Sequence, residues 1–88
     1  MFNVYADGTC RGNPGPMSIG ASLQKDGQEI ATVSEAIGDG TNNIAEYRAA
    51  IEGLKRASKH GVDEIELRMD SELVVKQLKG EYQAEMLD

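Results

Sequence analysis

The sequence predicts a single α/β domain, residues 1–88, in which a parallel fourth strand extends a three-stranded antiparallel meander. Helices are expected after the third and the fourth strand. Three observations predict this fold. Four segments alternate apolar and polar residues, which is the period of a half-buried strand. A long segment with the period of an amphipathic helix separates the third of these from the fourth. Asp26 and Gly27 stand between the second and third segments, and Asp-Gly is among the strongest hairpin signals.

The meander is expected to occupy the first 36 residues. The first strand covers residues 1–7, with Phe, Val and Ala on one face and Asn, Tyr and Asp on the other. A loop with several sharp turns is predicted over residues 8–16, because three Gly and two Pro fall there. The second and third strands follow over residues 17–25 and 28–36. Three strands joined in this way form an antiparallel meander.

The rest of the chain is expected to alternate helix and strand. A long helix runs from about Asn43 to Lys59, with Tyr47 in its apolar arc and basic side chains opposite. Gly61 suits the left-handed position that ends a helix. The fourth strand covers residues 64–69. Residues 72–79 are predicted to form a second helix, capped by the Asp-Ser pair that precedes it.

Composition excludes some classes of protein without choosing a function. The net charge of −6 argues against a nucleic-acid binder, which normally carries a basic patch. The same charge suits a site that gathers carboxylates around divalent cations. Cys10 is the single cysteine, so neither an internal disulfide nor a zinc cluster is expected, and a reducing cytoplasm is the expected location. The apolar runs are too short to cross a bilayer, and no signal peptide is expected.

Three carboxylates are candidates for one site. A helix that crosses back to a parallel strand sets the fourth strand beside the first, so Asp7 and Asp70 are expected at neighbouring strand ends. Either residue could instead simply end its strand as a turn or cap residue. Glu46 lies at the edge of the apolar arc of the long helix, facing the sheet. It could instead be a first-turn charge that interacts with the helix dipole. Together the three acids could ligate Mg²⁺ or Mn²⁺, and two such ions form the usual clamp for phosphoryl displacement.

Three motifs resemble those of type 1 ribonuclease H, in the same order and at the same spacing. The run from Asp7 to Pro16, followed by Gly-Ala at residues 20–21, resembles the first-strand signature of the family. Residues 41–50 (TNNIAEYRAA) resemble its first-helix signature, and residues 69–71 (MDS) its fourth-strand signature. The resemblance covers most of the chain and indicates the N-terminal portion of a ribonuclease H-like fold.

The resemblance implies an endonuclease that hydrolyses the RNA strand of RNA–DNA hybrids with two Mg²⁺ or Mn²⁺ ions. Asp7, Glu46 and Asp70 would be three of the four metal-binding acids of the family. Contacts to the hybrid across its minor groove, where 2′-hydroxyls distinguish RNA from DNA, would come from two segments. Their residues are Cys10, Gly12, Asn13, Thr41, Asn42 and Asn43. For the Asn residues, turn and cap chemistry is the alternative interpretation.

The chain also departs from the family pattern. The family continues into a fifth strand and a final helix that carries the fourth acid, for which these residues offer no counterpart. A free edge on the fourth strand would then invite self-association. A non-catalytic module of the same fold, binding nucleic acid or mediating assembly, is therefore the alternative function. A related ATPase lobe is a third candidate, and it would require that ATP stabilises the protein.

Overall fold

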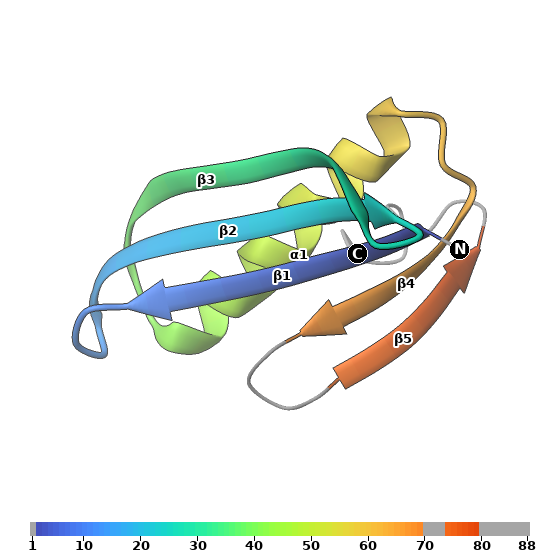
Figure 1. The fold of residues 1–88 in the computed structure, drawn as a ribbon. Helices are drawn as coiled ribbons and strands as arrows, with labels where there is room; N and C mark the ends of the chain where they lie inside the picture. Colours follow the sequence, from blue (N-terminus) through green and yellow to red (C-terminus); the bar gives the residue numbers. More distant parts are fainter. Residues whose placement is uncertain (1, 70–73, 80–88) are drawn as a thin grey trace.

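The computed structural model describes residues 2–69 and 74–79, which form a five-stranded sheet with one long helix against one face (Figure 1). The strands lie in the order β3-β2-β1-β4-β5. In chain order the elements are β1 (Phe2–Cys10), β2 (Gly15–Lys25), β3 (Gln28–Gly40), α1 (Asn42–Lys59), β4 (Glu64–Met69) and β5 (Val74–Lys79). The predicted α/β class, with a meander and a helix before the fourth strand, is confirmed.

The order of the first four strands follows from two connections. The β2–β3 hairpin turns at Asp26 and Gly27, whose φ angles of 52° and 82° belong to the tight turn that suits twisted strands. The helix α1 then carries the chain across the sheet, and β4 pairs with β1 in parallel, with Ala6 opposite Met69. The sequence predicted both connections. The parallel pairing of β1 with β4 sets the ends of these two strands side by side.

The strands of the meander are longer than the predicted ones. β1 continues to Cys10 and β2 already begins at Gly15, so only four residues of the predicted loop remain outside the strands. β3 continues to Gly40, which pairs with Gly15. The Arg11 N–H donates to the Pro16 carbonyl at 2.8 Å and closes the turn. The high Gly and Pro content predicted a loop here, but pairing with the neighbouring strand keeps the backbone extended.

The predicted second helix over residues 72–79 is wrong. Residues Val74–Lys79 form β5, which pairs antiparallel with all six residues of β4, from Glu64 opposite Lys79 to Met69 opposite Val74. Two consecutive β-branched residues begin this segment and favour a strand. The expectation of a free edge on β4 is wrong for the same reason, because β5 supplies partners for the backbone groups of that edge.

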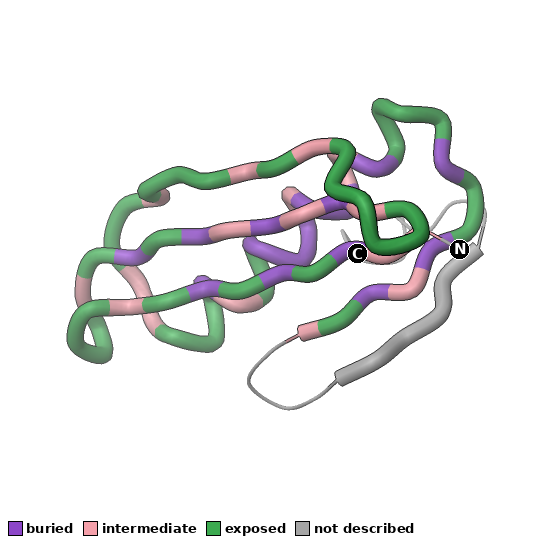
Figure 2. Tube along the Cα trace, in the orientation of Figure 1, coloured by how far each residue is buried: buried purple, intermediate pink, exposed green. Residues whose placement is uncertain are grey.

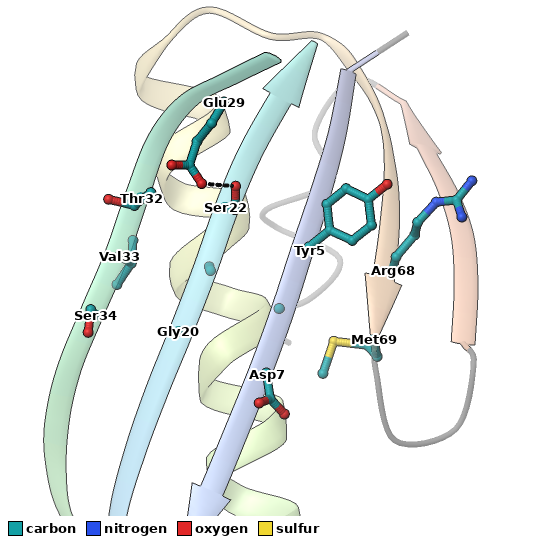
Figure 3. Close-up of a pocket in the computed structure, with 12 residues that line it drawn as sticks. Tyr5, Asp7, Gly20, Ser22, Glu29, Thr32, Val33, Ser34, Arg68 and Met69 are labelled. Atoms are coloured by element: carbon teal, nitrogen blue, oxygen red, sulfur yellow. Dashed lines mark hydrogen bonds between the residues drawn. The ribbon is translucent and has the colours of Figure 1, made fainter. Parts of the chain in front are cut away.

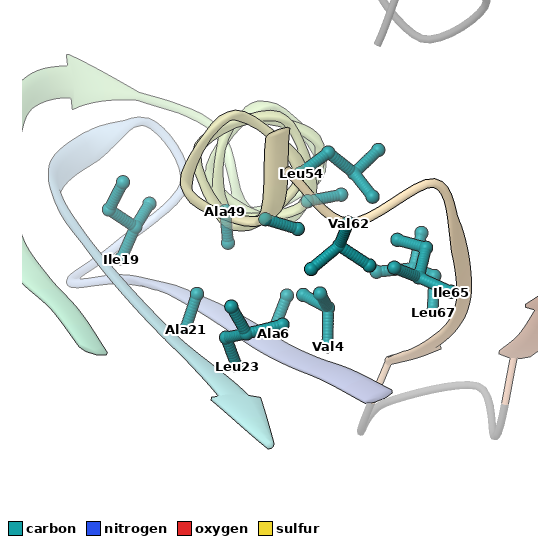
Figure 4. Packing of buried hydrophobic residues seen from close by; sticks show 12 residues of the cluster. Val4, Ala6, Ile19, Ala21, Leu23, Ala49, Leu54, Val62, Ile65 and Leu67 are labelled. Atoms are coloured by element: carbon teal, nitrogen blue, oxygen red, sulfur yellow. The ribbon is translucent and has the colours of Figure 1, made fainter. Parts of the chain in front are cut away.

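The hydrophobic core lies between α1 and the face of the sheet toward it (Figure 4). Along β1 and β2, buried side chains alternate with more exposed ones (Figure 2). The fully buried large side chains are Val4, Leu23, Leu54 and Ile65. Alanines supply most of the helix side, which brings the helix axis close to the sheet. Within the described residues, no helix is both long and apolar enough to cross a membrane.

Two glycines mark where helix and sheet approach most closely. A Cβ atom on Gly8 of β1 would lie 2.2 Å from the backbone carbon and oxygen of Ala45. A Cβ atom on Gly53 of α1 would lie 2.7 Å from a methyl group of Val4. A side chain at either position would push the helix away from the sheet. Small residues on the facing sides of β1 and α1 therefore allow this close approach.

Both ends of α1 are capped. At the C-terminal end, the Val62 N–H donates to Ala57 O and the Gly61 N–H to Ser58 O, with Gly61 at φ 73°. This is the Schellman arrangement, and it confirms the predicted role of Gly61.

Tyr47, which was placed in the apolar arc, is instead 48% exposed. Tyr47 lies outside the buried face of the helix, which consists of Ala45, Ala49, Ala50, Ile51, Gly53, Leu54 and Ala57.

We expect Gly8→Ala to lower the free energy of unfolding by about 3 kcal/mol, the upper end for an overpacked core. The added methyl group would overlap backbone atoms of α1, which cannot rotate away as a side chain can. The matched control is Gly20→Ala on β2, where the nearest atom to an added Cβ is 3.8 Å away. Denaturant unfolding checks both variants, and equal losses would contradict the proposed contact.

Candidate functional site

Asp7 lies near the end of β1, on the face of the sheet opposite α1. It alternates with the buried Ala6 and Gly8, and its side chain is exposed. Figure 3 shows the Asp7 carboxylate on this open face, with the helix behind the sheet. Its partner on β2 is Gly20, which has no side chain to cover the carboxylate. Asp7 is therefore accessible to a ligand from this side.

Glu46 lies on α1 and is half-buried. Its backbone is close to the end of β1, because a Cβ atom on Gly8 would lie 2.5 Å from the Glu46 nitrogen. Gly8 follows Asp7 directly, so the two acids come from backbone segments that touch. Glu46 is the fifth residue of the helix, and the first turn of α1 contains no acidic residue. The alternative that Glu46 is a first-turn charge is therefore wrong.

Asp70, the third predicted acid, lies outside the described residues. Met69, which precedes it, pairs with Ala6, which precedes Asp7. Within residues 2–69 and 74–79, no group of three or more His, Cys, Asp or Glu side chains is placed to hold a metal ion. The convergence of three acids on one point therefore stays a prediction.

The two described acids suit a hard divalent cation. Neither Asp7 nor Glu46 forms a salt bridge or a side-chain hydrogen bond with another described residue. No other described residue therefore occupies their carboxylate oxygens, and carboxylate oxygen is the donor that Mg²⁺ prefers.

The two predicted substrate-binding segments lie side by side at the turn between β1 and β2. The Asn42 backbone N–H donates to Asn13 Oδ1 at 3.1 Å. The Cys10 thiol lies 3.2 Å from the Gly40 carbonyl oxygen and 3.4 Å from that of Gly15. The structure thus brings together segments that are about 30 residues apart in the chain. Whether these residues contact a hybrid stays a prediction.

Local backbone chemistry shapes each of these segments. Gly12 has a φ of 90°, which side chains rarely allow, and it turns the chain between β1 and β2. Thr41 is the N-cap of α1, with extended backbone, and its hydroxyl accepts the Ile44 N–H at 3.3 Å. Asn43 is exposed in the first turn of the helix.

The open face also carries a pocket of about 680 Å³ that the sequence analysis did not identify (Figure 3). Asp7 lies at one end of this pocket, and Tyr5 and Arg68 line it from neighbouring strands. The guanidinium carbon of Arg68 lies 5.8 Å from the centre of the Tyr5 ring. Arg68 donates to Glu66 at 2.8 Å, and this hydrogen bond and charge raise the pKa of the arginine. The alternation of the sequence indicates which residues of β1 and β4 face outward. Which of these residues lie side by side depends on the strand register, which the sequence alone does not give.

Comparisons with known proteins agree with this architecture. The family model for RNase H matches residues 1–86. The chain is 49% identical over 81 residues to ribonuclease HI of Halobacterium salinarum, covering 91% of this chain and 41% of that protein. Over 87 residues it is 44% identical to the bifunctional protein Rv2228c of Mycobacterium tuberculosis, covering 97% of this chain and 24% of that protein. The chain thus spans less than half the length of these relatives.

Solved structures match in the same way. The crystal structure of RNase H1 from Halobacterium salinarum has a TM-score of 0.77 at 48% identity, covering 82% of this chain and 55% of that one. LC11-RNase H1 in complex with RNA/DNA hybrid has a TM-score of 0.78 at 38% identity, covering 99% of this chain and 71% of that one. The mixed sheet with a helix against one face thus has the ribonuclease H-like fold of the α/β class. The chain belongs to the RNase H family.

We expect Thr41→Val to lower the free energy of unfolding by about 1 kcal/mol, the usual loss for an N-cap side chain. The substitution keeps the shape of the side chain but removes the oxygen that accepts the Ile44 N–H. Thr32→Val, at an exposed position on β3, is the matched control, and valine is favoured in strands. Thermal unfolding measures both, and an unaffected Thr41→Val protein would contradict the capping role.

Proposed function

We propose that this protein hydrolyses the RNA strand of RNA–DNA hybrids with the help of two divalent metal ions. Membership of the RNase H family supports the reaction class. The observation that carries the proposal is the pair of carboxylates, Asp7 and Glu46, that no other described residue binds, on backbone segments that touch at the end of β1. LC11-RNase H1, similar along almost the whole of this chain, was crystallised in complex with an RNA/DNA hybrid.

In this proposal the acids have separate roles. Asp7 and Asp70 would hold the ions between them, and Glu46 would hold the second ion and orient the attacking water. Bound Mg²⁺ or Mn²⁺ would neutralise charge on the scissile phosphate and on both the attacking and the leaving oxygens. Attack of water on phosphorus breaks the bond to the 3′ oxygen, which leaves a 3′-hydroxyl and a 5′-phosphate.

Selection of the substrate is assigned to the joined segments around Asn13 and Asn42. The A-form-like minor groove of a hybrid presents 2′-hydroxyls, which both donate and accept hydrogen bonds. The amide side chains of Asn13, Asn42 and Asn43 offer donors and acceptors of the same kind, and all three residues are exposed. Phosphate contacts would add affinity without selecting RNA.

A non-catalytic module of the same fold, which binds nucleic acid or mediates assembly, is the second candidate. The net charge of −6 favours the assembly role, because proteins that bind nucleic acid normally carry a basic patch. The deciding experiment is a cleavage assay on a labelled hybrid with Mg²⁺ or Mn²⁺, run beside a binding assay. Hybrid binding without cleavage in either metal would support the module instead of the enzyme.

We expect Asp7→Asn to reduce hybrid cleavage roughly 10²- to 10³-fold, because a neutral amide cannot hold the ions as a carboxylate does. The fold should stay intact or become slightly more stable, since carboxylate repulsion is relieved. Asp63→Asn, at an exposed position before β4, makes the same charge change away from the site and should keep full activity. Undiminished Mg²⁺-dependent cleavage by Asp7→Asn would overturn the role of Asp7.

A second prediction concerns the choice of substrate. A hybrid should be cleaved at its RNA strand, and a DNA duplex of the same sequence should stay intact, because only the hybrid carries 2′-hydroxyls. Both duplexes must be compared at one salt concentration, since affinity for the phosphate backbone falls steeply with ionic strength. Product analysis on a denaturing gel is the measurement. Equal cleavage of both duplexes would rule out selection through 2′-hydroxyls.

A further inference from the structure

Among the described residues, the Asn13 side chain makes one hydrogen bond, and its partner is the protein backbone. Its Oδ1 atom accepts the backbone N–H of Asn42 at 3.1 Å. Asn42 is the first residue of α1, whose N–H has no acceptor within the helix. The contact therefore satisfies a helix donor from outside the helix. As long as it persists, the Asn42 N–H is not available to a substrate, and one of the two lone pairs of Asn13 Oδ1 is occupied.

The contact links the turn after β1 to the start of α1, close to the contact of the Cys10 thiol with the Gly40 carbonyl. Asn13 lies in the turn after β1, while Asn42 and Asn43 begin α1. The nearest backbone pairing between these segments is that of Gly15 with Gly40. Beyond this pair each segment leaves the sheet. The direction of the turn relative to the helix thus depends on the amide of Asn13, together with the Cys10 thiol beneath it.

We infer that Asn13 is a positioning residue, which fixes the spacing of the two substrate-binding segments by holding the N–H of Asn42. This inference rests on the proposed function. A duplex is a rigid ligand whose groove contacts must match at several points, so two contact segments bind well only at a fixed separation. Losing the Asn13 contact lets each segment move separately. The exposed amide nitrogen of Asn13 stays free, but the geometry assigns the main role to the oxygen.

A double-mutant cycle separates positioning from direct contact. Asn13→Ala removes the acceptor, and Asn42→Pro removes the donor. Proline is tolerated at the first helical position, and Thr41 before it, at φ −111° and ψ 165°, has the extended backbone that a following proline requires. If Asn13 acts through Asn42, Asn13→Ala adds little further loss to a protein that already carries Asn42→Pro.

The affinity for a labelled RNA–DNA hybrid without divalent cations is the readout, so the result does not depend on cleavage. We expect Asn13→Ala to weaken binding about 5-fold, which corresponds to one hydrogen bond. The double variant should bind no more weakly than Asn42→Pro alone. Gln28→Ala removes an exposed amide at the other end of the sheet and should leave binding unchanged. Where the chain cleaves the hybrid, Asn13→Ala should raise KM and leave kcat unchanged.

Asn13→Asp provides the conservative rescue. It keeps an oxygen acceptor for the Asn42 N–H and removes the amide donor. Its added charge repels phosphate, but about 0.3 M salt screens that repulsion beyond several ångströms. At this salt concentration its affinity should return to the wild-type value measured under the same conditions, while Asn13→Ala stays weaker.

Three outcomes would overturn the inference. Multiplicative losses in the cycle would show that Asn13 contacts the hybrid independently of Asn42. An Asn13→Asp protein as weak as Asn13→Ala at high salt would show that the amide donor matters instead. A wild-type chain that binds no hybrid would remove this inference together with the proposed function. The first two outcomes leave the proposed function standing, so the two failures are distinguishable.

Discussion

The close packing of α1 on β1 and β2 is the constraint on which the rest of the structure depends. Gly8 and Gly53 leave no space for a Cβ atom between the layers, and buried alanines line the helix. This contact carries most of the core and also fixes where the helix begins relative to the end of β1. The spacing between the Asp7 and Glu46 backbones is therefore set by the same atoms that stabilise the fold. Stability and site geometry cannot be varied separately at this point.

Much of this arrangement could be predicted from local patterns. Alternation marked β1, β2 and β4, Asp26-Gly27 marked the hairpin, and Gly61 marked the helix end. The helix between β3 and β4 then required a parallel return beside β1. These features are predictable because each depends on a few neighbouring residues, or on a topological rule with very few exceptions.

Other features depend on contacts between distant residues and could not be predicted in this way. The apolar spacing in residues 72–79 fits a short helix, but residues Val74–Lys79 pair with the edge of β4 and form β5. Tyr47 fits a helical apolar arc, but it lies outside the face of the helix that is buried against the sheet. The contact of Asn13 with Asn42 and the stacking of Arg68 on Tyr5 both depend on strand register. For Asp70, the parallel strand pairing was predictable, whereas the position of its carboxylate was not.

Because the sheet has one covered and one open face, β1 carries two separate sets of residues, one facing the helix and one facing outward. Val4, Ala6 and Gly8 face the helix, while Tyr5 and Asp7 face outward. Along this strand, tolerance to substitution should therefore alternate residue by residue. Substitutions at the inward positions should lower the yield of folded protein. Substitutions at the outward positions should change the surface chemistry and leave the fold intact. Evolution can thus revise the outward set without disturbing the core beneath it.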